Sequence, residues 1–361
     1  MKSVYIHIPF CDTICSYCDF CKFIINHDWI FKYLNALEKE ITKKYTGELI
    51  ETLYIGGGTP SSLNIEELKK LFSILNQINK SPDLEFTFEC NIENINYDKL
   101  KLLYENGVNR LSIGIQTFNT KFLKYLNRNH AKKEVFDKIK LAKEIGFKNI
   151  NIDLIYAIPG ESLNDLENDI DEFLKLDITH ISTYSLIIEP HTMLSIKKEE
   201  NIDEDLDYRM YELICDKLKN HGYNHYEISN FSKKGYESKH NLTYWNNEEY
   251  YGFGLGASGY INGVRYDNTR SLNDYLNGKY IYESRKLDIK EKIENEFILG
   301  LRKINGIDKG LFKLKYNIDI KSIEIVNKLL KESKLLENKK NIYINPKYIY
   351  VSNDILIEFI D

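Results

Sequence analysis

Three cysteines near the start of the chain are spaced so that they could hold an iron–sulfur cluster. Cys11, Cys15 and Cys18 follow the alternating apolar segment Ser3–Ile8, which predicts a strand that Pro9 ends. Cysteine thiolates hold such clusters, and three of them on one short loop can bind three irons of a cubane while the fourth iron has no protein ligand. The spacing C-x3-C-x2-C therefore predicts a cluster with one iron open to another molecule.

Other uses of these cysteines have to be weighed. A structural zinc site usually contains two C-x2-C pairs, whereas Cys90 and Cys215 are isolated and far away in the sequence. Disulfides need an oxidising compartment, and nothing in the sequence marks secretion. Cys21 is a fourth nearby thiol, which we interpret as packing beside Phe20 and Phe23 because the first three cysteines already complete the motif.

The elements that must position these cysteines alternate along the chain. Apolar segments that predict strands lie at residues 3–8, 52–55, 85–91, 110–116, 149–156 and 180–188. Segments with helical spacing lie between them, at residues 29–44, 64–75, 96–104, from about 117 to 145, and 163–176. This alternation predicts an α/β fold with a parallel, partial (β/α)6 barrel.

Chemistry-bearing residues recur at the carboxyl ends of these strands, where a parallel barrel keeps its working residues: Cys11, Gly57, Glu89, Gln116 and Asp153. The glycine-rich turn after residue 55 lets backbone N–H groups approach a ligand closely. Glu89 and Asp153 follow apolar runs, where an unpaired carboxylate is costly to bury. We expect each to accept hydrogen bonds from a ligand; the alternative is a structural carboxylate paired with a backbone N–H, Arg110 or Arg128.

A second unusual stretch places His240 and the aromatic residues Tyr244 and Trp245 before a glycine-rich strand expected over residues 250–260. This combination suits a planar ligand such as a porphyrin, whose iron takes an axial imidazole. The alternative is that His240 is a packing residue beside Trp245.

The end of the chain changes character. Helical patterns near residues 293–301 and 323–336, then two short strands around a turn at Pro346, predict a small α+β, winged-helix-like domain. Acidic residues interrupt its lysines, so a lid or docking module is favoured over DNA binding. We expect three regions: 1–230 with the barrel and cluster, 231–287 with the histidine and glycine-rich stretch, and 288–361 as the C-terminal domain.

Composition limits the classes of function. The chain has 361 residues, 43% hydrophobic and 29% charged, with a net charge of −5. These values are ordinary for a globular protein and argue against a nucleic-acid partner. No apolar run is long enough to span a bilayer, and no signal peptide precedes the first strand, so we expect a cytoplasmic protein that is not an integral membrane protein.

Several motifs together carry a family resemblance. These are Tyr5 to Cys11, Gly56 to Ser61, Ser112 to Phe118, Leu126 to His130, and Asp153 to Tyr156. With C-x3-C-x2-C they resemble the radical S-adenosylmethionine (radical SAM) superfamily, specifically its HemN/HemW branch, over nearly the whole chain. The resemblance implies a 4Fe-4S cluster on the three cysteines and S-adenosylmethionine chelating the open iron, with electron transfer able to split the sulfonium into an adenosyl radical.

Within this branch, three features favour haem chaperones over oxygen-independent coproporphyrinogen III oxidases. Phe20 stands where the oxidases have a further cysteine, only four residues precede Tyr5 where the oxidases have an extension, and H-N-x-x-Y-W begins at His240. The resemblance then implies haem binding and transfer to an acceptor protein, at a membrane or elsewhere. Oxidative decarboxylation is the alternative, and enzymatic activity and oligomeric state stay open.

The resemblance also implies roles for single positions. Contacts with S-adenosylmethionine fall on Tyr5, Gly57, Gly58, Thr59 and Glu89. Positions that face a second such molecule in the oxidase match Gln116, Arg128 and Asp153, with Tyr17 beside them in the cysteine loop, while the haem-binding position is His240. Ser258 stands where relatives often carry a histidine, so any haem contact from that side chain is lost.

Overall fold

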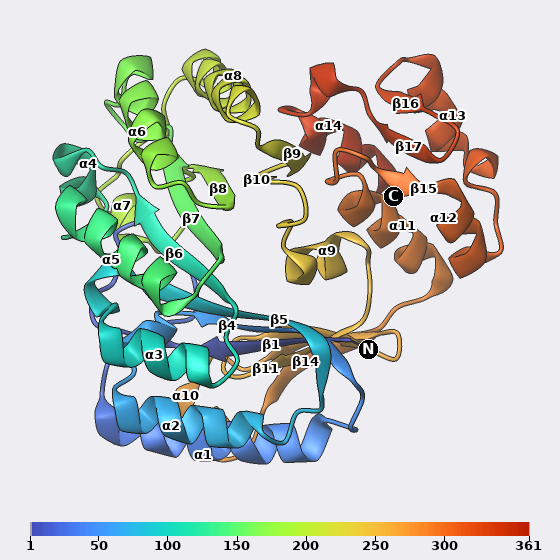
Figure 1. The fold of residues 1–361 in the computed structure, drawn as a ribbon. Coiled ribbons are helices and arrows are strands. Elements are labelled where there is room, and N and C mark those ends of the chain that lie inside the picture. The colour runs from blue at the N-terminus through green and yellow to red at the C-terminus, as the bar shows by residue number, and fades with distance from the viewer. Residues whose placement is uncertain (1, 361) are drawn as a thin grey trace.

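The computed structural model describes residues 2–360 (Figure 1). Residues 1 and 361, where the predicted first region begins and the predicted third region ends, lie outside the described residues. The main sheet has twelve strands, which in spatial order are β14 (Ile281–Lys286), β13 (Val264–Asn268), β12 (Ser258–Ile261), β11 (Tyr250–Phe253), β1 (Ser3–Ile8), β4 (Ile50–Gly57), β5 (Lys80–Asn91), β6 (Arg110–Gln116), β7 (Asn149–Tyr156), β8 (His180–Ser185), β10 (Asn230–Ser232) and β9 (Asn224–Glu227).

The six strands from β1 to β8 in this order run parallel to one another, as their alternation with helices predicted. Strand β6 shows how the sequence builds them. Leu111 and Ile113 alternate with Ser112 and Gln116, and alternate side chains of a strand point to opposite faces of the sheet. One face of these strands is therefore apolar, and the other carries polar groups toward a pocket. The predicted bounds of β6 and β7 are confirmed, while β8 ends at Ser185 rather than at residue 188.

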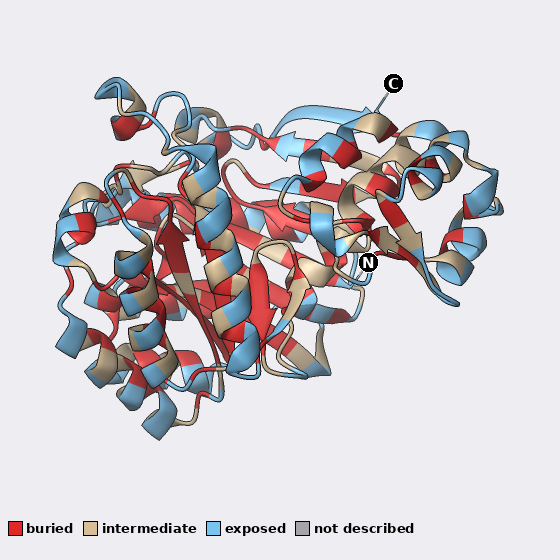
Figure 2. Ribbon diagram, turned by 90° about the horizontal axis from the view of Figure 1, so that it is seen from above, coloured by how far each residue is buried: buried red, intermediate tan, exposed pale blue. Residues whose placement is uncertain are grey.

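Helices cover the apolar face of the parallel strands (Figure 1), and the longer ones are α1 (His27–Lys44), α2 (Ile65–Leu75), α3 (Tyr97–Glu105), α5 (Lys132–Ile145), α6 (Leu163–Lys175) and α8 (Glu204–Asn220). The short helices of this part are α4 (Thr120–Tyr125), α7 (Met193–Ile196) and α10 (Leu272–Leu276). In α1, Ile30, Leu34, Leu37 and Ile41 share one buried face, as helical spacing requires. Figure 2 shows this pattern, with exposed outer helix faces around buried strands. None of the described helices is long and apolar enough to cross a membrane.

The glycine-rich segment after residue 250 differs from its prediction as one strand. It forms two antiparallel strands, β11 and β12, because Gly254 and Gly256 turn the chain with positive φ values of 99° and 73°. A Cβ at Gly252 would lie 1.9 Å from the carbonyl oxygen of Ser258, so only glycine fits there. Strand β11 pairs in parallel with β1, which extends the central sheet across the predicted boundary at residue 230.

The C-terminal part has a hydrophobic cluster of its own, which includes Phe297, Leu329 and Ile342. Its elements are α11 (Ile289–Gly300), β15 (Ile307–Asp308), α12 (Lys309–Tyr316), η3 (Ile320–Ser322), α13 (Glu324–Lys331), β16 (Leu335–Glu337), β17 (Asn341–Ile344), η4 (Pro346–Tyr348), α14 (Ser352–Leu356) and η5 (Ile357–Phe359). This part lies beside the main sheet (Figure 1).

Two predictions for the C-terminal part are wrong. The helix predicted over residues 323–336 ends at Lys331, because Ser333 adopts a left-handed φ of 56° and Leu335 begins β16. Strands β16 and β17 pair with each other, so the hairpin turn precedes residue 341. Pro346 instead opens a short 3-10 turn, since proline has no N–H group for a strand ladder.

Candidate functional site

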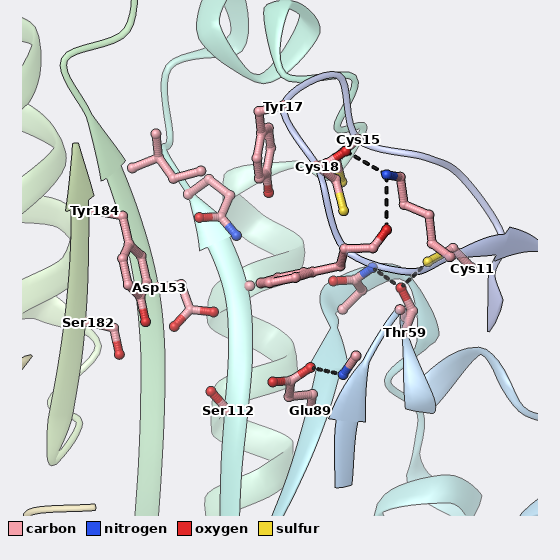
Figure 3. A pocket seen from close by; sticks show the side chains of 18 of the residues that line it. Cys11, Cys15, Tyr17, Cys18, Thr59, Glu89, Ser112, Asp153, Ser182 and Tyr184 are labelled. Carbon is pink, nitrogen blue, oxygen red and sulfur yellow. Dashed lines mark hydrogen bonds between the residues drawn. The ribbon is translucent and has the colours of Figure 1, made fainter. Parts of the chain in front are cut away.

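A pocket of about 420 Å³ lies at the carboxyl ends of the parallel strands (Figure 3). The cysteine loop, residues 11–21, covers one side of it, and side chains of β5 to β8 form the other side. The structure brings most of the predicted site residues to this pocket: Cys11, Cys15, Tyr17, Cys18, Gly57, Gly58, Thr59, Glu89, Gln116, Arg128 and Asp153. Tyr5, Cys21 and His240 are not among its lining residues.

The three cysteines of the motif are free thiols, and Cys11 and Cys15 have polar partners. The Thr59 hydroxyl donates to Cys11 Sγ at 3.4 Å, and Arg128 Nη1 lies 3.6 Å from Cys15 Sγ. Burial raises the pKa of Cys11 to about 11, so ligation of iron by its thiolate would release a proton. A hydroxyl donor and a guanidinium suit thiolate ligands. Among residues 2–360, however, no group of three or more His, Cys, Asp or Glu side chains is arranged to hold a metal ion, so the cluster assignment stays a prediction.

Cys21 occupies a different environment. Its side chain is buried, and a Cβ at Gly256 would lie 2.7 Å from Cys21 Cβ. Its carbonyl oxygen is 2.8 Å from His7 Nε2. Cys21 thus lies against the glycine turn after β11 rather than against the pocket.

The glycine turn after β4 brings backbone to the pocket wall. Gly57 has a φ of 115°, and a Cβ on it would lie 2.6 Å from the His7 ring. A Cβ on Gly58 would lie 2.9 Å from Cys11 Sγ. Larger residues would push the turn away from the cysteine loop, so both glycines are needed for this close approach.

Glu89 and Asp153 are half-buried carboxyl groups that line the pocket. Glu89 accepts hydrogen bonds from the Tyr54 hydroxyl at 2.8 Å and the Gly57 N–H at 3.0 Å, and Asn151 donates to Asp153 at 2.9 Å. Burial raises the pKa of Glu89 to about 7 and that of Asp153 to about 6. Both can therefore exchange protons near neutral pH.

The predicted alternative of an arginine partner for these carboxylates has no counterpart among the described ion pairs. Arg128 instead donates to Gly114 O at 2.5 Å and to Asn91 Oδ1 at 2.9 Å, with Glu93 at 4.0 Å. Gln116 ends β6 with a positive φ of 74°, and its Oε1 is buried without a partner. A non-glycine residue in this conformation together with an unsatisfied acceptor is typical of a ligand-binding position.

Sequence reasoning missed further polar residues that line the pocket, namely Arg110, Ser112, Asn151, Ser182, Tyr184 and Asn241. The first five lie on β6, β7 and β8, and two of them, Ser112 and Ser182, are in register with Glu89 and Asp153 on the neighbouring strands. Ser112, for example, is two residues from Gly114 and four from Gln116 along β6. Side chains two residues apart on a strand point to the same face, so this spacing could have located these residues from the sequence.

His240 lies in α9 (Lys239–Trp245), which packs on the polar face of the sheet near β4. The side chain is 1% exposed; Nδ1 is 2.8 Å from the Thr52 hydroxyl, and Nε2 is 2.8 Å from the Tyr244 hydroxyl. Glu85 accepts the backbone N–H of His240 at 3.0 Å. Burial lowers the pKa of His240 to about 3, so the imidazole is neutral. Both ring nitrogens have partners, so neither is available to an iron in this conformation.

Tyr54 connects this buried histidine with the pocket. Its ring centroid lies 5.1 Å from that of His240, while its hydroxyl donates to Glu89. Tyr5 packs beside both rings, at 6.0 Å from Tyr54 and 6.4 Å from His240, and its hydroxyl is 3.0 Å from His7 Nδ1. Tyr54 therefore contacts both Glu89, a predicted cofactor contact, and His240, the predicted haem ligand.

Residues 5–173 match the sequence profile of the Radical SAM superfamily. With parallel β/α strands and a cysteine loop over their carboxyl ends, the chain is a radical SAM protein. The heme chaperone HemW of Bacillus subtilis (strain 168) is 43% identical over 100% of this chain and 99% of its own length. HemW of Lactococcus lactis subsp. lactis (strain IL1403) is 40% identical over 99% of this chain and 97% of its own. The chain belongs to the HemW family of haem chaperones, which confirms the predicted resemblance.

A solved structure shares the fold over the full chain. Coproporphyrinogen III oxidase (HemN) from Escherichia coli, a radical SAM enzyme, matches with a TM-score of 0.87 over 99% of this chain and 90% of its own, at 22% sequence identity. The C-terminal part is therefore included in the shared fold.

Proposed function

We propose that this protein binds haem and transfers it to an acceptor protein. The observation that carries the proposal is the similarity to HemW chaperones over the full length of the chain. The motif H-N-x-x-Y-W, which distinguishes the chaperone side of the branch, lies in α9 on the pocket side of the sheet.

The proposal includes two further bound groups. Cys11, Cys15 and Cys18 would hold a 4Fe-4S cluster, and Gly57, Gly58, Thr59 and Glu89 would hold S-adenosylmethionine, with Tyr5 packed behind Tyr54. Together these groups supply, when bound, a one-electron route to an adenosyl radical. Two features support their placement: the Gly57 turn lies beside Cys11, and Glu89 offers an acceptor whose burial favours a hydrogen-bonded ligand.

His240 is the proposed haem ligand, and its surroundings set a condition on that role. Axial ligation through Nε2 requires that the Tyr244 hydroxyl first move away, since it lies 2.8 Å from that nitrogen. The neutral imidazole suits ligation because one of its ring nitrogens carries no proton, so the lone pair of that nitrogen can bind iron. Haem binding at this site thus includes a local opening of α9.

A second candidate, oxidative decarboxylation of coproporphyrinogen III, is favoured by one observation. Gln116, Arg128 and Asp153, which match positions for a second S-adenosylmethionine in the oxidase, all line the same pocket. Both candidates need the same cluster, so only binding and turnover distinguish them.

The test compares haem binding with turnover under anaerobic conditions. Haem is titrated into the cluster-loaded protein and into the His240→Ala and Tyr244→Phe variants, with the Soret band as readout. We expect His240→Ala to lose binding and Tyr244→Phe to bind more tightly, because Nε2 is then held by no hydroxyl. Coproporphyrinogen consumption is assayed with S-adenosylmethionine and a reductant. Turnover would establish the oxidase, and Soret titrations that are equal in all three proteins would exclude His240 as the ligand.

The organisation of the chain supports a division of labour. We keep the proposed regions 1–230, 231–287 and 288–361, and the separate core of the last region supports its role as a lid or docking module for the acceptor. Its winged-helix-like class and the cytoplasmic location remain predictions. Size-exclusion chromatography with and without haem tests whether the protein forms oligomers.

A further inference from the structure

Arg110 is the feature of the pocket that the proposed function leaves unexplained. It begins β6, lines the pocket, and is only 2% exposed, which makes it one of the largest fully buried side chains of the chain. Its side chain forms no hydrogen bond or ion pair with any residue between 2 and 360, and its Nε is buried without a partner.

An unpaired guanidinium in a protein interior is unusual, because removing the charge from water is costly unless a partner restores the interaction. Arg128 lines the same pocket and has partners: it donates to Gly114 O and to Asn91 Oδ1, and Glu93 lies 4.0 Å away. The two buried arginines of this pocket thus differ: within the described part of the chain, Arg128 has hydrogen-bond partners and Arg110 has none.

The neighbouring carboxyl groups do not replace a direct partner. Glu89 is engaged by Tyr54 and Gly57, and Asp153 by Asn151. Burial raises the pKa of both groups toward neutrality, so a fraction of each is uncharged near pH 7. The charge of Arg110 lowers the pKa of both groups against their burial, but neither group forms a hydrogen bond or an ion pair with Arg110 among residues 2–360.

The surroundings of Arg110 are suited to a polar group of a ligand. Ser112, Ser182 and Asp153 face the pocket from neighbouring strands (Figure 3), and Asn241 reaches it from α9. Asn151 holds Ser112 by a hydrogen bond of 2.9 Å, which orients this polar layer. A guanidinium with hydroxyl and amide neighbours is a suitable receptor for a carboxylate, which it can bind through two parallel N–H donors.

We propose that Arg110 forms a carboxylate subsite at the base of this pocket and pairs with a carboxylate of the bound ligand. This inference rests on the proposed function, which supplies two carboxylate sources: a propionate of haem and the methionyl carboxylate of S-adenosylmethionine. In either case the guanidinium gains a partner of the kind that residues 2–360 do not provide.

The experiment combines an Arg110 substitution with removal of the carboxylate from the ligand. Cluster-loaded wild-type protein and the Arg110→Met variant are titrated anaerobically with haem and haem dimethyl ester by absorption, and with S-adenosylmethionine and its decarboxylated form by calorimetry. Arg110→Met should weaken binding of one carboxylate-bearing ligand by about tenfold or more and leave its carboxylate-free counterpart unchanged. The ligand pair in which the effect of Arg110→Met depends on the carboxylate shows whether haem or S-adenosylmethionine supplies that carboxylate.

Two further variants separate pairing from folding. Arg110→Lys keeps the positive charge but lacks the two parallel N–H donors of the guanidinium. It should therefore recover part of the preference for the carboxylate-bearing ligand over its carboxylate-free counterpart. Thr87→Val changes the residue in register with Arg110 on β5, which does not itself line the pocket, and should leave all four affinities unchanged. If Arg110→Met loses the iron–sulfur absorption, the four ligand titrations are compared between wild type and Arg110→Lys instead.

The outcomes distinguish this inference from the proposed function. Absence of coupling in both ligand pairs overturns the carboxylate subsite even if haem binds tightly. Failure of the wild-type protein to bind haem overturns the chaperone proposal, and the S-adenosylmethionine pair then decides the subsite by itself.

Discussion

Replacing Glu89 by glutamine tests the electrostatics of the pocket most directly. Burial, assisted by the charge of Asp153, raises the pKa of Glu89 from 4.5 to about 7 against the opposing hydrogen bonds from Tyr54 and Gly57. Since one pKa unit is worth about 1.4 kcal/mol, ionisation of Glu89 removes roughly 3 kcal/mol of stability from the folded state. The amide of Glu89→Gln can accept the Gly57 N–H and donate to the Tyr54 oxygen, so the packing is retained.

The sign of the pH dependence follows from where the proton is bound. The folded protein keeps the proton on Glu89 up to about pH 7, while the unfolded chain releases it near 4.5. This contribution to stability is fully present below pH 4.5 and is lost as the pH rises through 7. Glu89→Gln has no carboxyl to ionise, so its free energy of unfolding relative to wild type should rise by about 2 kcal/mol between about pH 5.5 and about pH 8.5.

Urea unfolding followed by circular dichroism measures this difference, on anaerobic cluster-loaded protein without S-adenosylmethionine. Glu93→Gln is the matched control. Although burial opposes it, the contact with His130, whose Nδ1 lies 3.5 Å from Glu93 Oε1, and the charge of Arg128 lower the pKa of Glu93 to about 2, so its titration lies below the pH range used. A free-energy difference between Glu89→Gln and wild type that is the same at both pH values would refute the reasoning, because Glu89 would then ionise equally in both states.

Three further predictions concern the pocket residues and the separate hydrophobic cluster of the C-terminal part. Cys15→Ser should abolish the iron–sulfur absorption of reconstituted protein and Cys21→Ser should retain it; equal loss would show that the ligand assignment is wrong. Tyr54→Phe removes a hydrogen bond to Glu89 and should weaken S-adenosylmethionine binding roughly fivefold by calorimetry, whereas unchanged affinity counts against Glu89 as a contact. Leu329→Ala should lower the free energy of unfolding by about 2–5 kcal/mol in urea while cluster absorption persists, and joint loss would mean that the cores unfold together.

Local sequence patterns were sufficient for much of the fold and the site. The period of two along β6 and β7 located both strands, and helical spacing in α1 located its buried face. The cysteine spacing and the Gly57 turn are contiguous motifs, so their place at strand ends followed from the alternation of strands and helices. The prediction of a helix over residues 323–336 was wrong because its hydrophobic period was short and one left-handed φ angle, that of Ser333, can end a helix.

The sequence by itself determined the order of the parallel strands, the cysteine loop and the family. Only the tertiary structure decided that β11 joins β1, that Thr52 and Tyr244 hydrogen-bond to the His240 ring, and that Arg110 has no hydrogen-bond or ion-pair partner among residues 2–360. Period and propensity specify which face of a segment is buried, but a partner in space depends on how distant segments pack. Thr52 and His240 are separated by 188 positions, and nothing local to either residue encodes their contact.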